Sequence, residues 1–182
     1  MIKRIAILRA INVGGKRKIL MADLKVLFKD LEFCDIKTYI QSGNVIFSSI
    51  KEITDNEISQ RIENAISEKY EFDVPVIIRK VSELEQVILS NSFYQEKEID
   101  VKKLHLTFLK EKPSLENRLK TEAYDYSPDK FVINDKNVFI FCDGKYHQSK
   151  LTNNFFENKL KVSATTRNWK TVLKLLELSK TN

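Results

Sequence analysis

The order of apolar patterns along this chain restricts its possible folds more than any other feature, because the same order occurs twice. Alternating apolar residues predict strands, and apolar residues at helical spacing predict amphipathic helices. Along the first half these patterns give the order β-α-β-β-α-β, which is that of ferredoxin-like folds. The second half repeats it. We therefore predict an α+β protein of two ferredoxin-like lobes that arose by duplication, followed by a C-terminal helix.

The first lobe is expected to cover residues 1–81. Its hairpin is indicated by Ser42-Gly43, which reads as a tight turn between two apolar runs. Its second helix is expected to open at Thr54, because Thr54-x-x-Glu57 fits a capping box. Strands are expected at residues 5–8, 37–41, 44–47 and 75–79, and the first helix at residues 21–31.

The second lobe is expected to cover residues 82–182 and to begin with a connector helix capped by Ser82-x-x-Glu85. Its hairpin, VINDKNVFI, resembles YIQSGNVIF of the first lobe at the position that duplication requires. Strands are expected at residues 105–109, 131–133, 138–141 and 162–164, and helices from Pro113 and Ser114 and at residues 149–159. The C-terminal helix is expected to present Trp169, Val172, Leu173 and Leu176 on one face.

The cysteines and the hydropathy indicate a reduced, cytoplasmic chain. Cys34 and Cys142 are far apart and have no CxxC spacing, so free thiols are expected rather than a disulfide or a zinc site. Arg9 interrupts the apolar N-terminal stretch, which argues against a signal peptide. No apolar run approaches the ~20 residues of a membrane span, so no membrane partner is expected.

The charge is unevenly distributed. The formal net charge is +6, and residues 145–182 hold 8 Lys and Arg against 2 Asp and Glu. A basic end can dock phosphates or acidic partners, although most charge runs are only solvated faces.

Two glycine loops are expected to meet at one edge of the first lobe. In a ferredoxin-like sheet of order 4-1-3-2, strand one ends where strands two and three are joined by their turn. The first helix also begins there. The residues expected to converge at this edge are Arg9, Asn12, Gly14, Gly15, Lys16, Ser42, Gly43 and Asn44.

Such an edge suits an anionic ligand. Glycines let backbone N–H groups approach a ligand closely, a helix N-terminus adds partial positive charge, and Arg9 can bind a carboxylate or phosphate in a bidentate manner. The sequence GGKRK nevertheless lacks the ending and spacing of a Walker motif. A tight loop with a solvated basic tip, and a plain hairpin turn at Ser42-Gly43, remain the structural alternatives.

A second candidate is the sequence TTRNW. Arg167 and Asn168 are expected at the start of the C-terminal helix. The partial positive charge of a helix N-terminus favours an anion there too. Arg79 is expected at the opposite end of its sheet and is interpreted as structural. His105 and His147 lack metal-ligand spacing, and Ser42 has no neighbouring base, so no catalytic residue, metal site or cofactor is predicted.

The strings LRAINVGG, MADL, TYIQSGNVIFSS and ATTRNWKTVLKL follow one another along the chain. Together they resemble, over essentially the whole chain, a bacterial family of unknown function, number 1697 among the domains of unknown function. The family pattern reads LRGINVGG, so Ala10 departs from it and indicates that close backbone approach is dispensable there. The resemblance implies that residues 12–15, 42–44 and 167–169 are the family's marked positions. It implies no activity, ligand or partner.

The leading hypothesis is a binding module for a small anionic or phosphorylated ligand at the glycine edge of the first lobe. One alternative is an enzyme that acts on a phosphate ester or nucleotide, with Arg9 and Arg167 as charge clamps. Another is an RNA-binding protein, since ferredoxin-like sheets serve as RNA platforms. The predicted first strand, IAIL, carries none of the aromatic residues that such a platform needs. The oligomeric state is left open.

Overall fold

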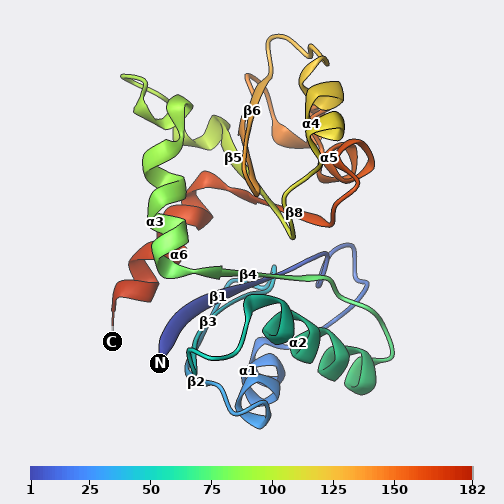
Figure 1. Cartoon of the computed structure of the whole chain (residues 1–182), viewed down its shortest axis with the longest axis vertical. Coiled ribbons are helices and arrows are strands. Elements are labelled where there is room, and N and C mark those ends of the chain that lie inside the picture. Colours follow the sequence, from blue (N-terminus) through green and yellow to red (C-terminus); the bar gives the residue numbers. More distant parts are fainter. Residues whose placement is uncertain (182) are drawn as a thin grey trace. The chain divides into compact units, whose positions relative to one another are not determined.

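Two four-stranded antiparallel sheets with the same strand order form the framework of the chain (Figure 1). The computed structural model describes residues 1–181. In spatial order, the first sheet contains β2 (Cys34–Tyr39), β3 (Asn44–Ser49), β1 (Ile2–Leu8) and β4 (Val76–Lys80). The second contains β6 (Lys130–Asn134), β7 (Asn137–Phe141), β5 (Leu104–Leu109) and β8 (Ala164–Asn168). The predicted α+β class and the duplicated strand order are confirmed.

Helices follow the predicted order. The first β-α-β-β-α-β segment contains α1 (Met21–Asp30) and α2 (Asp55–Tyr70), and the second contains α4 (Leu115–Glu122) and α5 (Asn153–Leu160). Two further helices are the connector α3 (Val81–Ser90) and the C-terminal helix α6 (Trp169–Lys180). Short 3-10 turns are η1 (Ser92–Gln95), η2 (Val101–Lys103) and η3 (Tyr146–Gln148).

The chain divides into two compact units. Unit 1 comprises Met1–Leu84 together with the chain from Leu175 onward, and unit 2 comprises Glu85–Lys174. Both α3 and α6 therefore contribute residues to each unit.

The core of unit 1 lies between its sheet and the pair α1 and α2. Leu24 and Phe28 of α1 and Ile62 of α2 are fully buried at helical spacing against Phe47 of β3. The predicted capping box fixes the start of α2: the Thr54 N–H donates to Glu57 Oε2 at 2.8 Å, and the Glu57 N–H donates to Thr54 Oγ1 at 3.2 Å. Such a cap contributes about 1 kcal/mol to the stability of a helix.

The core of unit 2 repeats this arrangement. Phe156 and Leu160 of α5 are fully buried against Val138 and Ile140 of β7. Ser114 caps α4, as predicted, by accepting a hydrogen bond from the Asn117 N–H at 3.2 Å. Thr152 caps α5 in the same way, so this helix begins later than the sequence pattern predicted.

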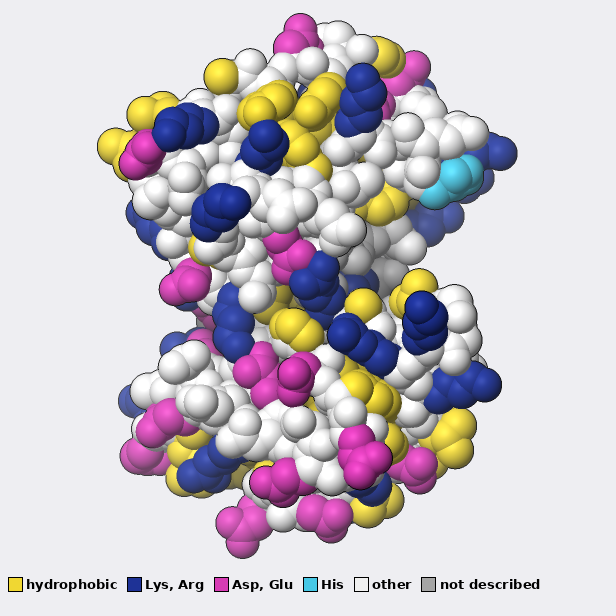
Figure 2. Space-filling view, turned by 90° about the vertical axis from the view of Figure 1, so that its right-hand side faces the viewer, with side chains coloured by type: hydrophobic (Ala, Val, Ile, Leu, Met, Phe, Trp, Pro, Cys, Tyr) yellow, Lys and Arg dark blue, Asp and Glu magenta, His cyan; other side chains and the backbone are white. Residues whose placement is uncertain are grey.

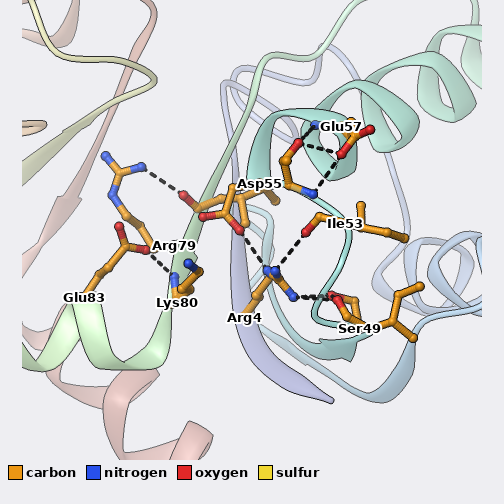
Figure 3. A network of polar contacts seen from close by, with 11 residues as sticks. Arg4, Ser49, Ile53, Asp55, Glu57, Arg79, Lys80 and Glu83 are labelled. Atoms are coloured by element: carbon orange, nitrogen blue, oxygen red, sulfur yellow. Dashed lines mark hydrogen bonds and ion pairs between the residues drawn. The ribbon is translucent and has the colours of Figure 1, made fainter.

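Two further helix starts differ from the expectation. The connector helix α3 begins at Val81, directly after β4, and the Lys80 N–H donates to Glu83 Oε2 at 2.7 Å (Figure 3). A box at Ser82 and Glu85 therefore does not form its cap. The last strand was expected at residues 162–164 but lies at Ala164–Asn168 (β8), so Arg167 lies on a strand instead of at a helix start.

Arg4 connects three elements of unit 1 and was not singled out in the sequence (Figure 3). Only 1% of this β1 residue is exposed. Its Nε pairs with Asp55 Oδ1 at 2.8 Å, Nη2 donates to the Ile53 carbonyl at 3.0 Å, and Nη1 donates to Ser49 Oγ. The guanidinium thus joins β1 to the end of β3 and to the first turn of α2.

Candidate functional site

The structure brings the two glycine loops of unit 1 into direct contact. The Leu8 N–H donates to the Gly43 carbonyl at 2.8 Å, and the Arg9 N–H donates to the Pro75 carbonyl at 2.9 Å. Asn12 Nδ2 donates to the Gln41 carbonyl, also at 2.8 Å. We call residues 9–19 and 41–44 the basic rim. Its two segments are far apart in sequence but meet at the end of β1.

Asn12 holds the basic rim together. Besides its bond to Gln41, Nδ2 donates to the Ile19 carbonyl at 2.9 Å, and Oδ1 accepts the Ile19 N–H at 2.9 Å. The side-chain amide therefore closes its own loop and ties that loop to the turn. These bonds make Asn12 a positioning residue of the rim, since its amide donors are directed at protein carbonyls.

Gly14 and Gly15 form the tip of a small hairpin. Their φ angles are +59° and +75°, Val13 bridges to Lys16, and the Lys16 N–H donates to the Val13 carbonyl at 3.1 Å. Positive φ at both central residues defines a type I′ turn, which favours glycine at both positions. The turn accounts for the glycines, and it leaves Lys16, Arg17 and Lys18 exposed on the tip and its returning arm.

Gly43 has a different role from the tip glycines. Its φ is +78°, and a Cβ placed on it would lie 2.7 Å from Ile11 Cδ1 and 2.8 Å from Leu8 Cβ. The absence of a side chain therefore lets the turn pack on the loop. Asn44 is fully buried beside it, and its Nδ2 donates to Tyr39 O and Ser42 Oγ, both at 3.2 Å. Gly43 thus lets the two segments of the rim pack together, and Asn44 holds the turn closed.

Ala10 has a φ of +54°, a left-handed backbone conformation that favours glycine. A left-handed backbone costs a residue with a Cβ roughly 1–2 kcal/mol. We expect Ala10→Gly to raise the free energy of unfolding by about 0.5–1 kcal/mol, because relief of this strain exceeds the added entropy of the unfolded chain. Urea unfolding would measure it. Ala22→Gly, on the exposed face of α1, is the control and should instead lower stability by about 0.5–1 kcal/mol.

The start of α1 adds backbone donors to the basic rim. Its N-cap residue is Leu20, which is 70% exposed and supplies no side-chain acceptor. The first N–H groups of a helix have no partner inside the helix and carry partial positive charge. Asp23 in the first turn offsets part of this charge. The rim therefore combines the N-terminal end of α1 with the side chains of Arg9, Lys16, Arg17 and Lys18.

The second sequence candidate belongs to unit 2 and is built differently from the prediction. Arg167 is buried on β8, where Nη1 donates to Thr165 Oγ1 at 2.9 Å and to the Thr166 carbonyl at 3.0 Å. Burial lowers the pKa of its guanidinium to about 10. Asn168 caps α6, because its Oδ1 accepts the Thr171 N–H at 2.8 Å. Within unit 2, both residues have clear structural roles.

A hollow beside the edge strand β2 was not predicted from the sequence. It has a volume of about 580 Å³ and is lined by residues of α1, β1, β2, β3 and the end of α6. We call it the lysine hollow, since its lining includes Lys3, Lys25, Lys29 and Lys37. These lysines are scattered in the sequence, and only the fold gathers them.

Unit 2 carries an aromatic surface with lysines on the side of α4 and α5. Figure 2 shows hydrophobic side chains there, bordered by dark-blue basic ones. Lys159 Nζ lies 4.5 Å from the ring centroid of Tyr124, and Lys150 Nζ lies 5.6 Å from that of Tyr126. Rings and cations together are typical of surfaces that bind single-stranded nucleic acid. Asp125 and Asp129, however, line the same hollow as Lys150, so this part of the surface is mixed in charge.

His105 is a buried titratable group of unit 2. Its ring stacks on Tyr146 with centroids 4.3 Å apart, and burial lowers the pKa of the imidazole, which favours the neutral form. Among residues 1–181, no three His, Cys, Asp or Glu side chains are grouped so that they could hold a metal ion. None of the described helices is long and apolar enough to cross a lipid bilayer.

Comparisons with known proteins agree with this architecture. A family model described as a protein of unknown function (DUF1697) matches residues 1–139. A similar solved structure is that of the conserved bacterial protein SP0830 from Streptococcus pneumoniae, with a TM-score of 0.79 and 22% sequence identity. The similarity covers 98% of this chain and 99% of that one, and at this identity it shows the fold alone. A search of curated proteins found no match.

Proposed function

Since the chain belongs to the DUF1697 family of proteins of unknown function, we propose from the geometry of unit 1 that it is a binding module for a small anionic or phosphorylated ligand. The ligand binds at the basic rim. The observation that carries this proposal is the contact between the two glycine loops, in which Asn12 Nδ2 donates to the Gln41 carbonyl at 2.8 Å. This contact fixes the loop that bears the cations.

The cations of the basic rim support an anionic ligand. Lys16, Arg17 and Lys18 are consecutive, exposed and carried on a hairpin that two backbone contacts close: Val13 with Lys16, and Asn12 with Arg17. A fixed hairpin places these charges at a lower entropic cost than a mobile loop would. The N-terminal end of α1 follows on the same loop and adds backbone N–H donors. Together these groups favour a compact, highly charged anion such as pyrophosphate.

Thermal unfolding in the presence of pyrophosphate tests the proposal. Pyrophosphate should raise the midpoint of unfolding, since a ligand at ~100 times its Kd adds about 2.7 kcal/mol to stability. The triple variant Lys16→Gln, Arg17→Gln, Lys18→Gln should lose most of this increase while it folds normally, because all three side chains are exposed. A matched control removes the same number of charges elsewhere, with Lys51→Gln, Arg61→Gln and Lys97→Gln, which are also exposed. Equal loss in both triple variants would show only a general effect of net charge and would contradict the proposal.

A further inference from the structure

We propose that the lysine hollow is a second binding site, distinct from the basic rim, for a small organic anion with an apolar body. The hollow, of about 580 Å³, falls in the size range of small-molecule sites. Its lining combines cations with apolar side chains. Such a combination selects a ligand whose charged head and apolar tail are both bound.

The cationic side of the lysine hollow has two fixed lysines and two that are available. Lys3 Nζ donates to the Ser179 carbonyl and Lys37 Nζ donates to the Thr181 carbonyl, both at 2.8 Å. These two bonds hold the end of α6 beside the sheet. Lys25 and Lys29 lie one turn apart on α1 and are exposed, so their ammonium groups can reach a ligand in the hollow. Among the described residues of the lining, the exposed Asp35 is the only one with a carboxylate, so these residues together carry an excess of positive charge.

The apolar side of the lysine hollow is formed by Phe33, Ile36, Ile46 and Leu178. Phe33, Ile36 and Ile46 are buried, and Leu178 is partly buried. The part of this surface that remains exposed, mainly on Leu178, favours a ligand whose apolar body removes it from water. An anion without an apolar body cannot use this surface, whereas an alkyl or aryl phosphate or carboxylate can. This difference separates the ligand class of the hollow from that of the basic rim.

A β-bulge opens the lysine hollow at the edge of the sheet. The pairing of β2 with β3 shifts between Cys34 and Lys37, and Asp35 has a φ of +52°. A bulge on an edge strand turns side chains away from their regular direction. Here the bulged segment leaves Cys34 exposed in the lining, where its free thiol can report on occupancy.

The rate at which iodoacetamide alkylates Cys34 tests the proposal on the full chain. We expect octyl phosphate to slow alkylation about tenfold at nine-tenths occupancy, because only unoccupied protein reacts. Inorganic phosphate at the same concentration should slow it much less. Mass spectrometry separates Cys34 from Cys142, which is buried and serves as the internal reference. The double variant Lys25→Gln, Lys29→Gln should lose most of the protection, whereas Lys16→Gln, Arg17→Gln should keep it.

Any one of the following four results would overturn the proposal. An unchanged rate with octyl phosphate would show that the hollow takes no such ligand. Equal protection by inorganic phosphate would show that the apolar side is unused, and full protection in Lys25→Gln, Lys29→Gln would show that the α1 lysines are unused. Faster alkylation of Cys142 would mean that octyl phosphate opens the fold. The basic rim enters this test only through its control variant, so failure of this proposal and failure of the proposed function can be told apart.

Discussion

Replacement of Arg4 by methionine is expected to lower the free energy of unfolding by about 3–5 kcal/mol. The guanidinium is almost completely buried and bonds to Asp55, Ser49 and the Ile53 carbonyl. Loss of one partner of a buried ion pair costs about this much, since the remaining groups are left without their donor. Asp55 keeps 32% of its side chain exposed, which favours the lower end of the range because water can replace part of the interaction.

Urea unfolding of Arg4→Met and of Arg61→Met provides the measurement and its control. Arg61 is exposed on α2, so its replacement should change the free energy of unfolding by about 0.5 kcal/mol or less. If Arg4→Met costs less than about 1 kcal/mol, the polar network in Figure 3 does not secure the start of α2 in the way that its bonds indicate.

Replacement of Gly43 by alanine is expected to lower the free energy of unfolding by about 2–4 kcal/mol. About 1 kcal/mol comes from the left-handed backbone at φ +78°. The remainder comes from overpacking, which typically costs 1–3 kcal/mol, since the new Cβ would lie 2.7 Å from Ile11 Cδ1 and 2.8 Å from Leu8 Cβ. To relieve this overlap the turn would have to move away from the loop, which would disturb the basic rim.

The tip glycines are the matched controls for Gly43. Gly14 and Gly15 also have positive φ, but a Cβ on either would have no atom within 4 Å. Gly14→Ala and Gly15→Ala should therefore each lower the free energy of unfolding by only about 1 kcal/mol, the strain of a left-handed backbone in a residue with a Cβ. Calorimetry of the three variants would measure the difference. Equal costs at all three positions would refute the close approach of the turn to Ile11.

The fold was predictable because its elements carry regular apolar periods and local caps. Leu24 and Phe28 recur at helical spacing, and Thr54-x-x-Glu57 forms the capping box that its sequence predicts. The strand β8 was predicted too early in the chain for a physical reason. Its residues, ATTRN, lack the apolar alternation that marks a half-buried strand, and the burial of Arg167 depends on its neighbours in the folded unit.

The candidate site was predictable in its placement and less so in its chemistry. Chain order alone indicated that the loop after β1 meets the β2–β3 turn, because ferredoxin-like topology places both at one edge. The structure then assigns the tip glycines to a type I′ turn and the Asn12 amide to the protein's own carbonyls. The lysine hollow could not be foreseen, since Lys3 and the α1 lysines share no local pattern.

A titration of ¹⁵N-labelled protein with pyrophosphate, followed by backbone amide NMR, tests the central claim most directly. We expect saturable shifts that are confined to residues 9–19 and 41–44 and to the first turn of α1, and that disappear in Lys16→Gln, Arg17→Gln, Lys18→Gln. No saturable shift up to about 10 mM, where even a Kd of 1 mM would give near-complete occupancy, would contradict it. Shifts confined to residues of the lysine hollow would contradict it equally.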